Sequence, residues 1–69
     1  MLYTITVLDF TSGSIKIYKN VDLKDIDAEE WLSEVAKLDM DNCQWMSVPA
    51  EQFKIETENV QWPVVKYKN

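Results

Sequence analysis

The chain has 69 residues, of which 46% are hydrophobic, and its twelve Asp and Glu residues against seven Lys give a net charge of −5. This length allows one domain at most, over residues 1–69, and the apolar fraction is too high for a disordered tail. One cysteine and no histidine exclude an internal disulfide and a tetrahedral zinc site, so self-association or a partner remains as outside support for a small core.

The charge and the N-terminal sequence also restrict location and partners. The acidic balance and the absence of arginine disfavour direct contact with nucleic acid or with an anionic membrane. Since the chain begins with neither a basic leader nor an apolar run of membrane-spanning length, we expect a soluble, cytoplasmic protein.

The first third of the sequence predicts a β-hairpin. Residues 2–10, "LYTITVLDF", and 15–19, "IKIYK", alternate with the period of a strand, and both faces of the first segment carry apolar groups. The stretch between them holds the only glycine of the protein, Gly13, at the position where a tight turn needs positive φ.

A helix is predicted next. Asp27 is a candidate N-cap with Glu30 closing a capping box, and Ile26 and Trp31 stand where a hydrophobic staple would join them. Asn42 is the expected terminator after a helix of about eleven residues. One apolar stripe follows from spacings of three and four: Ala28, Trp31, Leu32, Val35 and Leu38.

Two further strands are predicted over residues 43–48 and 53–58, separated by Pro49 and one helical turn. The fold class is therefore α+β in the order ββαββ, with one helix packed on a small, mainly antiparallel sheet. Pro63 cannot donate to a ladder, so the last residues form either an edge strand or a docked tail.

Cys43 is either a reactive group or part of the core. A nucleophilic thiol needs a nearby cation, a histidine or a helix N-terminus to lower its pKa. Its neighbours in sequence include Asp39 and Asp41, which have the opposite effect. The pattern favours a small buried side chain in the third strand.

Neither a metal site nor catalysis is indicated. Residues 39–42, "DMDN", have the acid spacing of a calcium loop, but Gln44 and Ala50 stand where that loop needs glycine and glutamate. The serines lack a histidine or a lysine at triad-like spacing, and there is no glycine-rich phosphate loop. We expect a protein that is not an enzyme and binds no cofactor.

Two groups of residues are candidates for contact with a partner. One is a run of acids that either caps and solvates the helix start or meets a basic surface. We expect this run to continue onto the fourth strand, and its members are Asp22, Asp25, Glu29, Glu30, Glu34, Glu56 and Glu58. The other is a surplus of aromatic side chains, of which Trp62 and Tyr67 lie on the predicted edge, with the segment 60–67 covered by a partner or a second copy.

The segment "YTITVLDFTSGSIKIY", followed by an acidic helix and "CQWM", resembles the short reading frames carried by bacteriophages and mobile elements, over residues 2 to 48. Such frames include anti-CRISPR and other anti-defence proteins, which are small, acidic and non-enzymatic. The resemblance implies an inhibitor that occupies a surface on a host complex. The first hypothesis is thus a small protein-binding module for a basic surface, and the second is a structural subunit of a homodimer or larger assembly.

Overall fold

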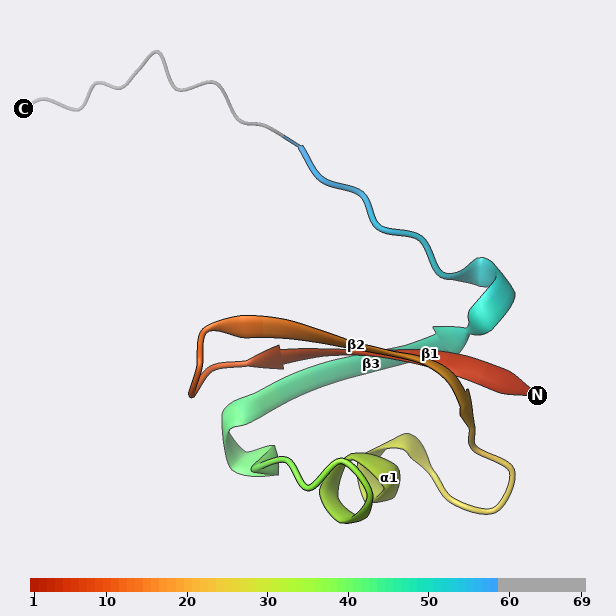
Figure 1. Ribbon diagram of the computed structural model, residues 1–69, viewed down its shortest axis with the longest axis horizontal. Helices are drawn as coiled ribbons and strands as arrows, with labels where there is room; N and C mark the ends of the chain where they lie inside the picture. Colours follow the sequence, from red (N-terminus) through yellow and green to blue (C-terminus); the bar gives the residue numbers. More distant parts are fainter. Residues whose placement is uncertain (59–69) are drawn as a thin grey trace, which may run out of the picture.

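Three strands and one helix make up the described part of the chain. The computed structural model describes residues 1–58, and the predicted edge strand or docked tail lies outside them. Strands β1 (Leu2–Asp9), β2 (Ser14–Asp22) and β3 (Cys43–Pro49) form an antiparallel sheet in the order β2-β1-β3. Helix α1 (Ala28–Glu34) lies against one face of this sheet (Figure 1). The α+β class is confirmed, with the order ββαβ over residues 1–58.

The hairpin between β1 and β2 closes as the sequence predicts. Gly13 has a φ of 68°, and its N–H donates to the Asp9 carbonyl oxygen at 2.8 Å. The Thr11 N–H donates to Asp9 Oδ1 at 3.0 Å, so the Asp9 carboxylate stabilises the turn by a hydrogen bond to its backbone.

The position of α1 follows from the strand directions. β2 and β3 are each antiparallel to β1, so they run in the same direction and need a crossover, which α1 provides across one face. The buried apolar core lies between this helix and the sheet. It consists of Ile5, Val7, Val21, Ala28 and Leu32.

The helix begins where predicted and ends earlier. Asp27 Oδ1 accepts a hydrogen bond from the Glu30 N–H at 2.8 Å, which confirms the N-cap. The helix stops at Glu34 because the chain reverses at Lys37, with a φ of 61°, and the Leu38 N–H donates to the Leu32 carbonyl at 3.1 Å. Val35 is left 57% exposed, outside the buried stripe.

The prediction that Asn42 terminates the helix is wrong. This residue closes a separate 3₁₀ turn, η1 (Met40–Asn42), whose N-cap is Asp39. The Asn42 Nδ2 donates to Asp39 Oδ2 at 2.7 Å, so the polar run 39–42 satisfies its own hydrogen bonds as it leads into β3.

The predicted fourth strand over residues 53–58 is wrong: these residues form neither helix nor strand. After the short turn η2 (Ala50–Gln52), the chain leaves the sheet on the side opposite α1 (Figure 1). Within residues 1–58 this segment therefore has no strand beside it to pair with, and Ile55 is 63% exposed. Alternation of polar and apolar residues does not make a strand without a partner edge.

A β-bulge decides which residues of β2 face the helix. Tyr3 pairs with Val21 and Ile5 with Tyr18, so β2 has one residue more than β1 in this interval. Asn20 accommodates the extra residue with a φ of 60°. As a result Ile17 faces away from α1 while Val21, four residues later, is buried beneath it.

Candidate interaction surfaces

The first candidate surface is acidic and lies on the helix side of the molecule. Asp25, Glu29, Glu30 and Glu34 are all exposed, on α1 and the loop before it. Ala28 and Leu32 are buried against the sheet, so Glu30 and Glu34 point away from it, about 6 Å apart along the axis. In residues 1–58, none of these four acids forms an ion pair with a lysine.

Helix capping explains only part of this acidity. Glu29 and Glu30 lie in the first turn, where negative charge is favourable beside the helix N-terminus. Glu34 is the last residue of α1, and the last turn holds no basic residue. A carboxylate there is unfavourable towards the helix dipole, and it also lies four residues from the like charge of Glu30. Glu34 is therefore the acid that local stability does not account for.

Other predicted partner residues are not part of this surface. Glu56 and Glu58 belong to the segment 53–58, which leaves the sheet after η2 on the side opposite α1 (Figure 1). Glu56 pairs with Lys54 at 3.0 Å. The predicted continuity of Glu56 and Glu58 with the helix acids is wrong, because it depended on the missing fourth strand. Asp22 pairs with Leu2 at the end of β2, where its Oδ1 accepts from the Lys24 N–H. Trp62 and Tyr67 lie outside the described residues.

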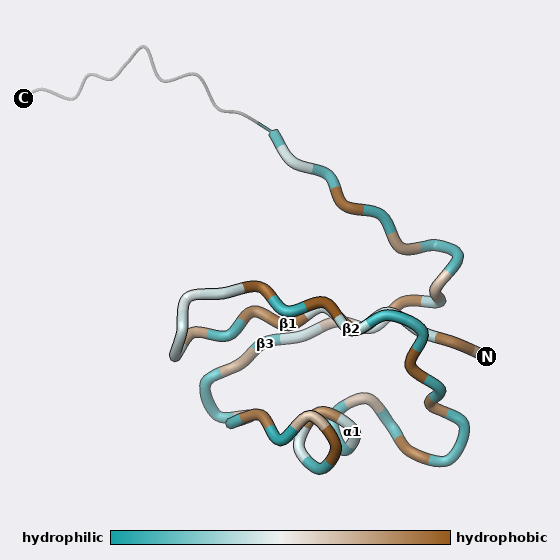
Figure 2. The backbone as a smooth tube through the Cα atoms, viewed as in Figure 1, coloured by the Kyte–Doolittle hydropathy of each residue, from teal (hydrophilic) through white to brown (hydrophobic). Residues whose placement is uncertain are grey.

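The second candidate surface is the face of the sheet that α1 leaves open, and the sequence reasoning missed it as a site. Figure 2 shows hydrophobic and hydrophilic residues alternating along β2, and the register places Ile15 and Ile17 on this open face. Leu8 on β1 and Met46 on β3 share this face and are exposed as well. The available signal was the apolar character of both faces of residues 2–10, which one helix cannot cover.

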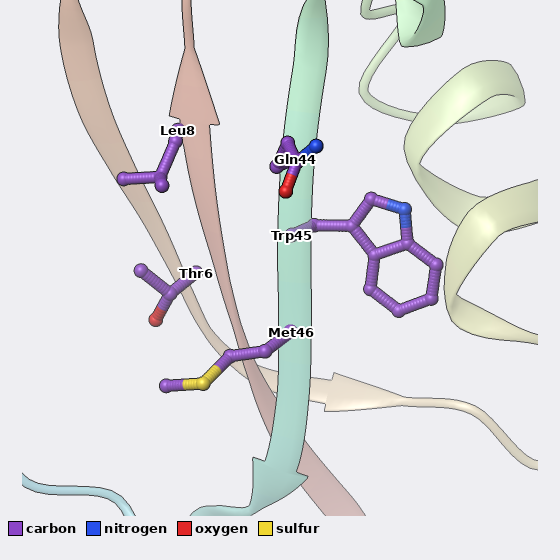
Figure 3. Close-up of a pocket in the computed structure, with 5 residues that line it drawn as sticks. All are labelled: Thr6, Leu8, Gln44, Trp45 and Met46. Atoms are coloured by element: carbon purple, nitrogen blue, oxygen red, sulfur yellow. The ribbon is translucent and has the colours of Figure 1, made fainter.

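A groove of about 240 Å³ runs over this open face. The side chains of Thr6, Leu8 and Met46 project from β1 and β3 on the open side of the sheet, whereas the Trp45 ring lies on the side of α1 (Figure 3). The hydroxyl oxygen of Thr6 is buried and has no hydrogen-bond partner in the described part of the chain. Gln44 also lines the groove, so two polar side chains lie within an otherwise apolar surface.

Cys43 is part of the packing around the core, as predicted. It is partly buried and contacts the core cluster. Burial raises the pKa of its thiol, and the carboxylates of Asp9 and Asp39 raise it further, against a smaller opposing effect of Lys16. Sequence reasoning identified Asp39 and missed Asp9, which the β1–β3 register places directly opposite Cys43.

Asp9 has the opposite perturbation. Its partial burial raises the carboxyl pKa, but hydrogen bonds from Thr11 and Ser12 and the charge of Lys16, 3.6 Å away, outweigh that effect and lower the pKa overall. The carboxylate is therefore held ionised at the base of the hairpin turn, where it accepts the hydrogen bond from the Thr11 N–H.

Within residues 1–58, no group of three carboxylate or thiol side chains is placed to hold a metal ion. No helix in that same part of the chain has the length and apolar character needed to cross a membrane. Comparisons with protein families, curated proteins and solved structures found no match to this chain.

Proposed function

We propose that this chain is a small, non-enzymatic protein-binding module that uses the acidic side of α1 to occupy a basic surface on another protein. The observation that carries the proposal is the set Asp25, Glu29, Glu30 and Glu34, which is exposed and makes no ion pair with a lysine of residues 1–58. Such a surface attracts a basic partner and speeds its association.

Glu34 gives this proposal its sharpest support. An acid at the last position of a helix, beside another acid one turn earlier, costs a few tenths of a kcal/mol of helix stability. Contact with a cation of a partner offers a use for such a charge. The resemblance to anti-defence proteins of bacteriophages suggests that the partner is a host complex in the cytoplasm and that occupation of its basic surface inhibits it.

The test compares two properties of Glu34→Gln. We expect the variant to be slightly more stable in chemical denaturation, and to capture less of the partner from a lysate of the cell in which the protein acts. A triple variant, in which Glu29, Glu30 and Glu34 are each changed to Gln, should lose capture. Glu51→Gln is the matched control, since Glu51 is exposed on η2, away from α1.

A captured protein supports the proposal only if it is lost from the triple variant, retained by Glu51→Gln, and released as salt is raised, because charge-led contacts weaken with ionic strength. Retention of the same protein by the triple variant at unchanged affinity would contradict the proposal.

The second candidate function is that of a structural subunit, and the open apolar face of the sheet favours it. Its central exposed side chains are neutral, so an assembly formed through it does not weaken as salt rises.

A further inference from the structure

The open face of the sheet carries no charge over its central length. The strand pairings place eight neutral residues at its centre: Thr4, Thr6, Leu8, Ile15, Ile17, Gln44, Met46 and Val48. The charged residues Lys19, at the bulge opposite Thr4, and Asp22, opposite Leu2, lie at the border of this set. Such a neutral centre is notable in a chain with nineteen charged residues, twelve acidic and seven basic, and a net charge of −5. Two copies that approach through this face bring no carboxylates of that central set together, whereas α1 would place acids against acids.

The dimensions of the face fit a small interface between two copies. Three strands about 4.8 Å apart and seven residues at roughly 3.3 Å each make a surface of about 14 by 23 Å. Leu2 and Phe10 extend it at either end of β1 and are both exposed. Two such surfaces have a combined planar area of about 640 Å², and the relief of the side chains and the residues at the two ends bring the buried area up to the lower end of specific protein interfaces.

The buried core is small, and it lies only on the α1 side of the sheet in residues 1–58. Five buried apolar residues hold α1 to the sheet, and within residues 1–58 α1 is the only α-helix. An exposed apolar patch of several hundred Å² marks an interaction site.

We propose that the open face binds a second copy of this chain, sheet against sheet, about a twofold axis. Two antiparallel sheets stack in this way at a separation of about 10 Å. Gln44 is exposed in the groove, so each copy offers the other an amide donor and acceptor within the apolar contact. Both acidic α1 surfaces then point outwards, and the dimer presents two of them.

The test is sedimentation of the full chain over a range of concentrations and two salt concentrations. We expect a reversible monomer–dimer equilibrium with a dissociation constant of about micromolar order, as suits a small interface. Each copy carries a charge of −5, so added salt screens the repulsion and tightens the dimer. This sign is opposite to that expected for the acidic surface with a basic partner, so the two proposals fail independently.

Matched isoleucines provide the variant and its control. Ile15 lies on the open face and is 65% exposed, and Ile55 lies off the sheet and is 63% exposed. Both substitutions to lysine place the new charge in water in a monomer, so the fold is retained in each. We expect Ile15→Lys to weaken the dimer at least roughly tenfold, since the charge becomes buried in the pair, and Ile55→Lys to leave it unchanged.

Met46→Lys is a second variant, on the opposite edge strand β3, and it should have the same effect as Ile15→Lys. A wild-type chain that stays monomeric at every concentration overturns the proposal and indicates a different occupant of the face. A dimer that withstands both Ile15→Lys and Met46→Lys overturns it equally, since the contact must then lie elsewhere.

Discussion

The ring of Trp31 on α1 meets the ring of Tyr18 on β2 edge to face, with centroids 5.3 Å apart and planes inclined at 70°. Both residues are half-buried and pack against the core. Tyr18 faces the helix because it pairs with Ile5, the fully buried residue of β1. This aromatic pair therefore joins the crossover helix to the edge strand of the sheet.

The Tyr18–Trp31 contact should be measurable as a coupling energy. We expect a double-mutant cycle with Tyr18→Leu and Trp31→Leu to give a coupling of about 0.5–1.5 kcal/mol in chemical denaturation, beyond the area that each ring buries. A cycle of Trp31→Leu with Tyr3→Leu, on the central strand, serves as the comparison. Strict additivity of the first pair would show that the rings do not interact in solution.

Asp27→Ala should lower the free energy of unfolding by about 0.5–2 kcal/mol, because the Glu30 N–H loses its acceptor at the helix start. Glu29→Ala is the control: it lies in the same first turn without a capping hydrogen bond and should cost much less. Equal losses in urea denaturation would mean that Asp27 does not cap α1.

Gly13→Ala should destabilise the hairpin by about 1 kcal/mol, since a side chain at a φ of 68° is strained even though nothing lies near the added carbon. Gly13→Asn should cost less, because asparagine tolerates the left-handed region better than alanine. Thermal denaturation of the two variants decides this. An alanine variant as stable as wild type would show that the turn adopts another conformation.

Thr6→Val tests the orphan hydroxyl on the open face. In an isolated monomer we expect equal or greater stability, because the change removes a buried oxygen that lacks a partner in residues 1–58 and keeps the shape of the side chain. Denaturation should be followed at a concentration well below that of self-association. A clear loss of monomer stability would show that the Thr6 hydroxyl is hydrogen-bonded.

The Cys43 thiol should alkylate slowly at neutral pH. Its pKa is raised by burial and by Asp9 and Asp39, so the thiolate forms at higher pH in the folded chain than in the unfolded one. Asp9→Asn removes one of these charges and should move the pH midpoint of iodoacetamide reaction downwards. Asp41→Asn is the control, since Asp41 is not among the groups that perturb this thiol. A midpoint that does not respond to Asp9→Asn would contradict the assigned cause.

Local signals predicted those features of the fold that depend on neighbouring residues. Gly13 marked the hairpin and Asp27 the helix start, because a tight turn and an N-cap are each decided within a few residues. The packing role of Cys43 was likewise predicted from the absence of an activating neighbour, although its side chain is partly and not fully buried. These inferences required no knowledge of how distant segments are arranged.

The errors concern features that depend on distant segments. Residues 53–58 alternate like a strand, but strand formation requires an adjacent edge, and the chain leaves the sheet after η2. The helix end was placed too late because the stripe includes Leu38, which reaches the core through the reversal at Lys37 and not through continued helix. To identify the open face, one must know how the three strands pair, and a single sequence does not show this pairing.

Because β2 has one extra residue opposite Thr4, a deletion at that bulge should disturb the fold less than a deletion elsewhere in β2. Loss of Asn20 would remove the bulge and still leave Val21 opposite Tyr3. The strand would then pair regularly, and its side chains would stay on the same faces of the sheet. Loss of one residue between Ile15 and Tyr18 would instead shift the register by one. The side chains on one side of the deletion would then move to the opposite face of the sheet. A deletion scan along β2 should therefore find a permissive site at Lys19 and Asn20, and the same site is where related chains could differ in length without losing the architecture.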